Sequence, residues 1–248
     1  MSRPELTLNP FLSIIIPAHN EQNRLPETLK QIFRFLDGQS FTSEVIVVEN
    51  GSSDRTYEAA QQFAKQHKNL RVIQSERGKG AAVQRGMLAA QGDYRFMCDA
   101  DLSMPVEEIV KFIPPALEDF DIGIASREAK GAVRYNEPSY RHIGGRGINF
   151  IIQALILPGL NDTQCGFKSF RAEVARDIFS RQTLHGWSFD IELLYIARCH
   201  GYRIREIPIH WHHFSDSKVN ALRDAVRMIR DIFRIHANAR RGTYGDAR

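Results

Sequence analysis

Short apolar runs alternate with stretches of helical periodicity along the first half of the chain. Runs rich in β-branched residues predict strands at 11–16, 44–48, 70–73, 94–98 and 121–125. Between them, apolar residues recur at helical spacing and predict helices at 24–36, 54–67, 80–90 and 106–120. Ser53 or Asp54 provides a start signal for the second of these helices, and Pro105 for the last. The alternation predicts an α/β domain built on a parallel sheet.

The pattern changes after residue 126. It predicts a helix at 140–157, a strand at 167–170, two further helices, a strand at 202–211 and a last helix at 218–236. No internal repeat or low-complexity segment interrupts the chain. In open sheets of this kind, ligands bind beyond the carboxyl ends of the strands. We therefore expect the functional residues in the loops after Ile16, Val48, Ile73 and Cys98.

The composition indicates the size of the domain and the cellular environment to expect. The 248 residues include 43% apolar side chains, which is enough for one proper core. The net charge of +4 is mild, although arginines are concentrated in the last thirty residues. Cys98, Cys165 and Cys199 lack the spacing of a zinc site or a redox pair, which favours a reducing, cytoplasmic setting. The sequence has no signal segment and no long uninterrupted apolar stretch, so we expect it not to span a membrane.

Two carboxylates follow the fourth predicted strand. Asp99 and Asp101 are separated by Ala100, and such a pair suits a hard cation such as Mg²⁺ or Mn²⁺ bridging protein and substrate phosphates. A solvated turn is the alternative, because Asp is common in turns.

The other loops favour a nucleotide. Residues 17–21 and 49–54 bring polar side chains to two neighbouring strand ends, and Gly51 permits a tight turn. Residues 77–80 read Arg-Gly-Lys-Gly and open a helix, so that the helix N-terminus and Lys79 can face phosphate. Together the loops predict a metal-assisted nucleotide-diphosphate site.

The runs SIIIPAHNE, EVIVVENGSSDRT, GKGAAVQRGM and DADLS occur in this order. They are followed by ASR, DTQCGFKSF, GWSFDIELLYIA and IPIHWHHFSDSKV. From Phe11 to about Val219 the sequence closely resembles the family-2 glycosyltransferases, and specifically the dolichyl- or polyprenyl-phosphate sugar synthases. The ending around Trp211, Ser217 and Lys218 is more similar to the glucosyl than to the mannosyl branch.

The resemblance implies a GT-A nucleotide-diphospho-sugar transferase fold, a mostly parallel twisted sheet flanked by helices. Residues 1–216 would form a single domain, with a donor half at about 11–126 and an acceptor half at about 127–216. Residues 217–248 would form a basic amphipathic helix and tail.

The resemblance also assigns donor-binding residues. It implies that the nucleotide is lined by Pro17, His19 and Glu21, that the base neighbours Val48 and Asn50, and that the diphosphate is held through the metal by Asp99, Ala100 and Asp101. Lys218 would close over it. The family often has two Asp where this chain has Glu49 and Asn50, which leaves the identity of the base open.

Three arginines follow the fifth predicted strand, and an arginine fork matches the paired oxygens of a phosphate. In the resembled family, arginines of this segment bind the lipid phosphate, which points to Arg127 first, and then to Arg141 and Arg134. A phosphate monoester has a second pKa of about 6 and is largely dianionic near neutral pH, so it needs no strong general base. Asp162, Asp190 and Glu192 are then expected to orient arginines or sugar hydroxyls. For Glu192, an internal ion pair on its helix is the alternative.

Residues near the C-terminal end suggest two further roles. His210, His212 and His213 do not have the spacing of a zinc site, although one of them could complete the metal shell. In the last helix one face is apolar, comprising Val219, Leu222, Val226, Ile229, Ile232 and Phe233, while arginines recur at Arg223, Arg227, Arg230 and Arg234. This helix could lie on an anionic bilayer or pack on the domain.

The sequence thus predicts an inverting glycosyltransferase that uses Mg²⁺ or Mn²⁺. Its donor would be UDP-glucose or GDP-mannose and its acceptor a polyprenyl or dolichyl phosphate. We expect Asp99, Asp101 and Arg127 to act in catalysis, and the protein to lie peripherally on the inner face of the cell membrane. A family-2 enzyme with a saccharide or small soluble acceptor is the main alternative. A nucleotidyltransferase lacks support because no Gly-rich loop follows the first strand, and a nucleic-acid-binding module would not explain Asp99 and Asp101.

Overall fold

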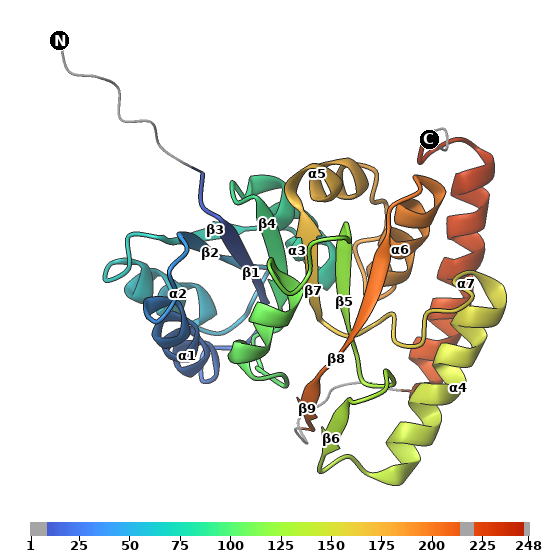
Figure 1. The fold of residues 1–248 in the computed structure, drawn as a ribbon, viewed down its shortest axis with the longest axis horizontal. Coiled ribbons are helices and arrows are strands. Elements are labelled where there is room, and N and C mark those ends of the chain that lie inside the picture. Colours follow the sequence, from blue (N-terminus) through green and yellow to red (C-terminus); the bar gives the residue numbers. More distant parts are fainter. Residues whose placement is uncertain (1–8, 214–220, 246–248) are drawn as a thin grey trace.

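A seven-stranded sheet forms the centre of the molecule and carries helices on both faces (Figure 1). The computed structural model describes residues 9–213 and 221–245. The strand order is β3-β2-β1-β4-β7-β5-β8. The strands span Leu12–Ala18 (β1), Ser43–Glu49 (β2), Leu70–Gln74 (β3), Tyr94–Cys98 (β4), Ile122–Ser126 (β5), Phe167–Arg171 (β7) and Ile204–Pro208 (β8). All five strands expected in the first half are present, with ends shifted by at most two residues.

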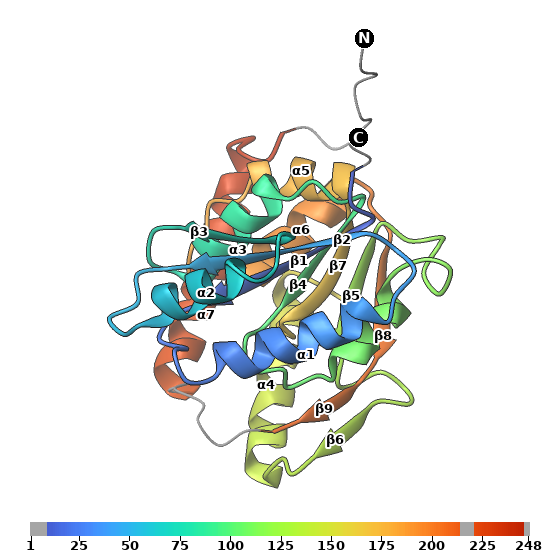
Figure 2. The ribbon, with the colours of Figure 1, turned by 90° about the vertical axis from the view of Figure 1, so that its left-hand side faces the viewer.

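The sheet separates two apolar cores because side chains alternate along each strand. Ile14 and Ile16 of β1 lie in the core on one face, and Ile15 lies in the core on the other. The first core contains side chains of α1 (Leu25–Asp37), α2 (Thr56–Ala64) and the 3-10 helix η1 (Val106–Phe112). The second contains side chains of α3 (Lys79–Ala89), α4 (Ser139–Leu155), α5 (Ala172–Ser180), α6 (Phe189–Cys199) and α7 (Ala221–Arg240). Figure 2 shows the sheet between these layers.

Strand β7 runs antiparallel to both of its neighbours, so the sheet is mostly rather than wholly parallel. The chain leaves β5, forms α4 and returns from the carboxyl edge of the sheet, which gives β7 the opposite direction. In the register of β4 with β7, Cys98 pairs with Phe167. The end of β4 therefore meets the beginning of β7.

Two expected elements differ from the structure, and one strand was not expected. The helix expected at 106–120 is only the short η1, because Pro114 and Pro115 follow and proline cannot continue a helical hydrogen-bond ladder. The strand expected at 202–211 is divided after Pro208 into β8 and β9 (His210–His212). Strand β9 pairs with β6 (Val133–Tyr135) in a separate two-stranded sheet, and β6 is too short for its pattern to have been recognised.

Helix α7 packs on the domain, and its buried face matches the expected one only in part. Met228, Ile232 and Ile235 are buried in the core beside α6, whereas Val226 and Phe233, which were expected on the same face as Ile232, are exposed. Val219 lies outside the described residues, and the side chain of Leu222 is not described. The helix thus has one apolar strip that packs inward and a second that faces outward.

No helix in the described part of the chain combines the length and the apolar character that crossing a bilayer requires.

Candidate active site

The loops after β1 and β2 are joined by hydrogen bonds at the carboxyl edge of the sheet. The Nδ1 atom of His19 lies 3.2 Å from the carbonyl oxygen of Asn50. The backbone N–H of Glu21 donates to Thr56 Oγ1 at 2.8 Å. Pro17 and Val48 are paired in the register of the two strands. The structure therefore places Pro17, His19, Glu21, Val48 and Asn50 at two adjacent strand ends.

The two residues that depart from the family pattern have different environments. Glu49 is buried, and its carboxylate accepts hydrogen bonds from the Ser52 N–H and from Gln74. Burial alone would raise the pKa of Glu49, but the bonds from Ser52 and Gln74 hold it below its ordinary value. The Oδ1 atom of Asn50 is buried and has no hydrogen-bond partner among the described residues. Since buried polar atoms are normally paired, the amide of Asn50 is the better candidate to receive a ligand.

Asp99 and Asp101 lie directly after β4, where the sequence predicts them. The Lys79 ammonium, on the first turn of α3, approaches the carboxylate of Asp99 to 2.7 Å. Burial works against a charged Lys79, but Asp99 and Asp190 outweigh it and raise the pKa of the ammonium. One oxygen of Asp101 accepts the Ser103 N–H at 2.9 Å. Lys79 thereby holds Asp99 in a fixed orientation at the strand end.

Gly166 leaves room for the carboxylate of Asp99. A Cβ atom at residue 166 would lie 1.9 Å from Asp99 Oδ2, far closer than any real contact. This closeness follows from the antiparallel register, because the residue after Cys98 faces the residue before Phe167. The second half of the chain thus forms one wall of the Asp99 site.

The residues present are compatible with Mg²⁺ or Mn²⁺ held between protein and substrate. Asp99 and Asp101 supply two carboxylates, and no group of three or more metal-binding side chains occurs within residues 9–213 and 221–245. Mg²⁺ commonly binds one or two carboxylates and takes its other ligands from phosphates and water. His210 instead faces Glu108 at 3.7 Å, and His212 stacks on Tyr135 with ring centroids 4.4 Å apart.

Arg127 lies just after β5 and is bound by Asp162. Its Nε and Nη2 atoms donate to the two oxygens of Asp162 at 2.7 and 2.8 Å, and its guanidinium lies 5.4 Å from the centre of the Trp211 ring. Burial opposes the charge of Arg127, but Asp162 outweighs it and raises the pKa of the guanidinium. Asp162 is 0% exposed, and Arg127 in turn lowers its pKa although burial would raise it. The pair is therefore fully charged, with Nη1 of Arg127 outside the Asp162 contact.

Arg134 and Arg141 were also predicted to bind the acceptor phosphate, and Lys218 to close over the diphosphate. Arg134 uses all three of its nitrogen atoms, since it donates to Glu128, to Glu137 and to the carbonyl oxygen of Arg127. It thus stabilises the loop that carries Arg127. The side chain of Arg141 and the whole of Lys218 lie outside the described residues.

The buried carboxylates that could serve as a general base are already engaged. Asp190 accepts from Lys168 at 2.6 Å, and Asp162 is bound by Arg127. Among the described residues Glu192 does not form the internal ion pair considered above. It accepts the backbone N–H groups of Thr183 and Leu184 and the hydroxyl of Tyr244. Each has a structural partner that restricts it.

Sequence reasoning missed two residues at the Asp99 site. Gly166 gave no signal because its role depends on strand register. The Trp187 ring lies 5.2 Å from Lys79 Nζ, although the side chain is 60% exposed. Both the exposure of Trp187 and its closeness to Lys79 depend on tertiary contacts, so no local pattern indicated this residue.

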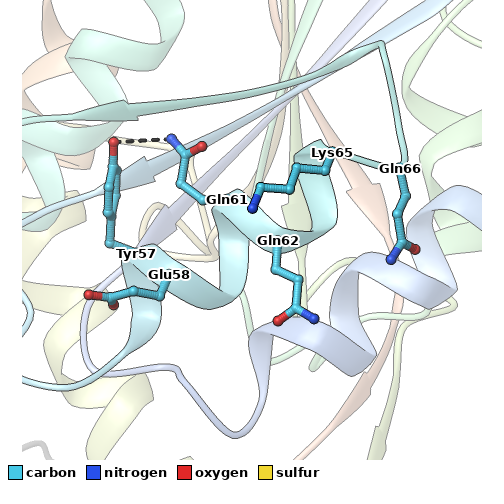
Figure 3. Close-up of a pocket in the computed structure, with 6 residues that line it drawn as sticks. All are labelled: Tyr57, Glu58, Gln61, Gln62, Lys65 and Gln66. Atoms are coloured by element: carbon cyan, nitrogen blue, oxygen red, sulfur yellow. Dashed lines mark hydrogen bonds between the residues drawn. The ribbon is translucent and has the colours of Figure 1, made fainter.

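A surface hollow along α2 lies apart from these residues. Its lining comes entirely from Tyr57 to Gln66, and Gln61 Nε2 donates to the Tyr57 hydroxyl at 3.0 Å (Figure 3). None of the predicted site residues lines it. The strand ends therefore remain the candidate site.

Comparison with known proteins agrees with this geometry. The sequence profile of glycosyl transferase family 2 matches residues 13–179. The dolichyl-phosphate beta-glucosyltransferase of Dictyostelium discoideum is 34% identical over 92% of this chain and 74% of its own length. The Drosophila melanogaster and human proteins of the same name are 35% and 32% identical, over 90% and 89% of this chain and 74% and 73% of their own lengths.

Solved structures share the fold at lower identity. The glucosyl-3-phosphoglycerate synthase of Mycobacterium tuberculosis superposes with a TM-score of 0.65 at 20% identity, over 92% of this chain and 80% of the other. A complex of that enzyme with Mn²⁺ and UDP-glucose gives a TM-score of 0.66 at 17% identity, over 90% of this chain and 78% of the other. The chain therefore belongs to glycosyl transferase family 2 and is a glycosyltransferase with the GT-A fold.

Proposed function

We propose that this glycosyltransferase moves a glucosyl group from UDP-glucose to a dolichyl or related polyprenyl phosphate, with inversion at the anomeric carbon. The observation that carries the proposal is the placement of two charged centres on one edge of the sheet. Asp99, Asp101 and Lys79 lie at the end of β4, and Arg127 lies at the end of β5, with only β7 between these strands. The names of the relatives supply the substrates.

The donor would extend along the strand ends from base to sugar. Asn50, with its unpartnered buried Oδ1, would contact the base beside Val48, while His19 and Glu21 would line the nucleotide. Asp99, Ala100, Asp101 and Lys79 would hold the diphosphate. A divalent cation bound there would neutralise the charge that develops on the departing diphosphate.

The acceptor phosphate would bind at Arg127. A charge-assisted bond from the guanidinium orients a phosphate oxygen toward the anomeric carbon. The oxygen forms the new bond to that carbon as the bond to the diphosphate breaks on the opposite face, which inverts the configuration. A dianionic phosphate needs no base, which fits the engagement of Asp162, Asp190 and Glu192 by other groups.

Transfer from labelled donors tests the proposal. With Mn²⁺ and dolichyl phosphate, we expect label from UDP-glucose to enter the organic phase, and label from GDP-mannose to enter it at least about tenfold more slowly, as for other pocket-based discrimination. The anomeric proton coupling of the product should show a β-linkage. Transfer only to a water-soluble acceptor such as phosphoglycerate, or no transfer from either donor, would refute the lipid acceptor.

We also propose that the paired helices α4 and α7 contact an anionic membrane surface. They lie side by side, and His236 on α7 approaches the Leu155 carbonyl oxygen of α4 at 3.1 Å (Figure 1). Four large apolar side chains of this pair are exposed, at Phe150, Leu155, Val226 and Phe233. Exposed arginines accompany them at Arg146, Arg227, Arg230 and Arg234. Exposed apolar side chains with basic neighbours are typical of interfacial helices.

Changing Arg227, Arg230 and Arg234 together to Gln should weaken sedimentation with anionic vesicles. Each arginine near an anionic leaflet contributes about 1 kcal/mol, so the loss should exceed about tenfold at physiological salt. The affinity of the parent should fall with added salt, because exposed charges are screened over about 8 Å. A matched control changes Lys30, Arg34 and Lys65, exposed on the opposite side of the sheet, to Gln. If the two variants bind anionic vesicles equally well, α4 and α7 do not form the membrane contact.

A further inference from the structure

The loop between α5 and α6 rests directly on the first turn of α3. The backbone N–H of Ala81 donates to the His185 carbonyl oxygen at 3.3 Å, and Gln182 Nε2 donates to the Gly80 carbonyl oxygen at 3.0 Å. The contact is so close that a Cβ atom on Gly78 would lie 2.3 Å from the His185 oxygen, and one on Gly80 would lie 2.7 Å from the Leu184 oxygen. The position of this loop therefore fixes the position of the turn.

That turn carries Lys79, which orients Asp99. The ammonium lies 2.7 Å from Asp99 and 5.2 Å from the centre of the Trp187 ring, and Trp187 belongs to the same α5–α6 loop. A shift of the loop would thus move Lys79, which contacts the Asp99 carboxylate, and Trp187, which contacts Lys79. Displacements of about an ångström in such supporting residues are enough to impair a site.

Glu192 fixes the backbone of the α5–α6 loop through hydrogen bonds. Its carboxylate is 0% exposed and accepts the N–H groups of Thr183 and Leu184 at 2.9 and 2.7 Å, together with the Thr183 hydroxyl at 2.5 Å. A buried carboxylate that accepts several hydrogen bonds fixes the conformation of the groups that donate them.

Tyr244, near the C-terminal end, supplies the remaining donor to Glu192. Its buried hydroxyl donates to Glu192 Oε1 at 2.7 Å. Burial and the Glu192 charge raise the pKa of Tyr244, so the hydroxyl keeps its proton and remains a donor. On α7, Asn238 donates to the Thr183 hydroxyl at 3.0 Å.

Two side chains, Arg181 and His200, hold the backbone carbonyl of Tyr244 in place. Its carbonyl oxygen lies 2.9 Å from both Arg181 Nη1 and His200 Nε2. Asp177 pairs with both of these side chains, at 3.0 Å from Arg181 and 2.8 Å from His200. Burial would raise the pKa of Asp177, but hydrogen bonds from Tyr202, His200 and Arg181 lower it to about 2. The hydroxyl of Tyr244 is therefore presented to Glu192 from a rigid support.

We infer that Tyr244 is a positioning residue for the donor-diphosphate site, acting through Glu192 and the α5–α6 loop on Lys79 and Trp187. The inference rests on the proposed function, in which Lys79 and Asp99 receive the diphosphate. It gives the end of the chain, far from the strand ends in sequence, a role in donor binding.

Tyr244→Phe tests the inference because it deletes only the hydroxyl. We expect the KM for the nucleotide sugar to rise about fivefold or more while the KM for the acceptor lipid stays unchanged. Trp187 and Trp211 are the two tryptophans of the chain, so in a Trp211→Phe background the fluorescence comes from Trp187. In that background, Tyr244→Phe should also change the fluorescence emission of Trp187. Glu192→Gln should change both readouts, and the double variant should show less than the sum of the single effects, since the residues act in one network.

Tyr195→Phe is the matched control. Its ring lies 6.2 Å from the Tyr244 ring, but among the described residues the hydrogen bonds to the Glu192 carboxylate come from Thr183, Leu184 and Tyr244. It should change neither the donor KM nor the Trp187 emission. If Tyr244→Phe lowers the melting temperature and leaves both readouts as in the parent, Tyr244 is merely structural and the inference is overturned. Failure of the proposed function would appear differently, as absence of transfer by the parent, and the Trp187 emission would still decide whether Tyr244 positions the loop.

Discussion

Replacing Asp99 or Asp101 by Asn should lower the rate of transfer by at least about a hundredfold, since a group that stabilises charge on the leaving diphosphate is weakened. Both residues lie in a loop at a strand end, so the fold should persist. Circular dichroism and the melting temperature check this point. Asp101→Asn is the cleaner change, because Asp99 also neutralises the partly buried Lys79.

Metal removal should have the same effect on the parent enzyme. Transfer should stop in excess chelator and return when Mn²⁺ or Mg²⁺ is added, whereas Asp101→Asn should recover only at much higher cation concentration. Asp119→Asn, an exposed carboxylate at the opposite edge of the sheet, is a suitable control and should behave as the parent. Full turnover in chelator would show that Asp99 and Asp101 do not hold a required cation.

Arg127→Lys should raise the KM for the acceptor lipid about tenfold and leave the KM for the nucleotide sugar unchanged. Lysine keeps the charge but cannot bind Asp162 through two parallel hydrogen bonds while it also contacts a phosphate. Arg127→Ala should be more severe, because it removes the guanidinium that pairs with the buried Asp162, leaves the carboxylate only the backbone N–H of residue 127 from this partner, and costs about 3–5 kcal/mol of stability. Initial rates at varied lipid and varied donor separate the two KM values.

A second arginine–aspartate pair provides the control for this prediction. Arg203 donates through Nε and Nη2 to the two oxygens of Asp121, at the other end of β5. Arg203→Lys perturbs a similar two-bond contact away from the strand ends and should change neither KM. If Arg127→Lys raises both KM values equally, Arg127 must be assigned to the donor site and not to the acceptor site.

The strand ends and their carboxylates could be predicted because the signals are local. A buried parallel strand is a continuous apolar run, and the residues that follow it must form a turn, so Asp99 and Asp101 were located from neighbouring residues alone. The helix at 106–120 was overestimated because apolar periodicity continues after Phe112 while Pro114 and Pro115 end the helix.

The partners of the site residues could not be predicted, because they depend on tertiary contacts. Asp162 is 35 residues from Arg127, and Tyr244 is 52 residues from Glu192. Periodicity in α7 indicated an apolar face, but only the packing against α6 decided that Met228 and Ile235 are inside and Phe233 outside. A pattern gives the faces of a helix, and the neighbouring elements decide which face is covered.

The antiparallel insertion of β7 has a consequence for protein engineering. Because β7 comes from the second half of the chain and lies between β4 and β5 of the first, the two halves cannot be exchanged as independent modules. A chimera that takes residues after 126 from another transferase would replace β7, an inner strand of the host sheet, together with the residue facing Asp99. Such a graft can preserve the Asp99 site only if the incoming strand pairs Cys98 in the same register and begins after a glycine.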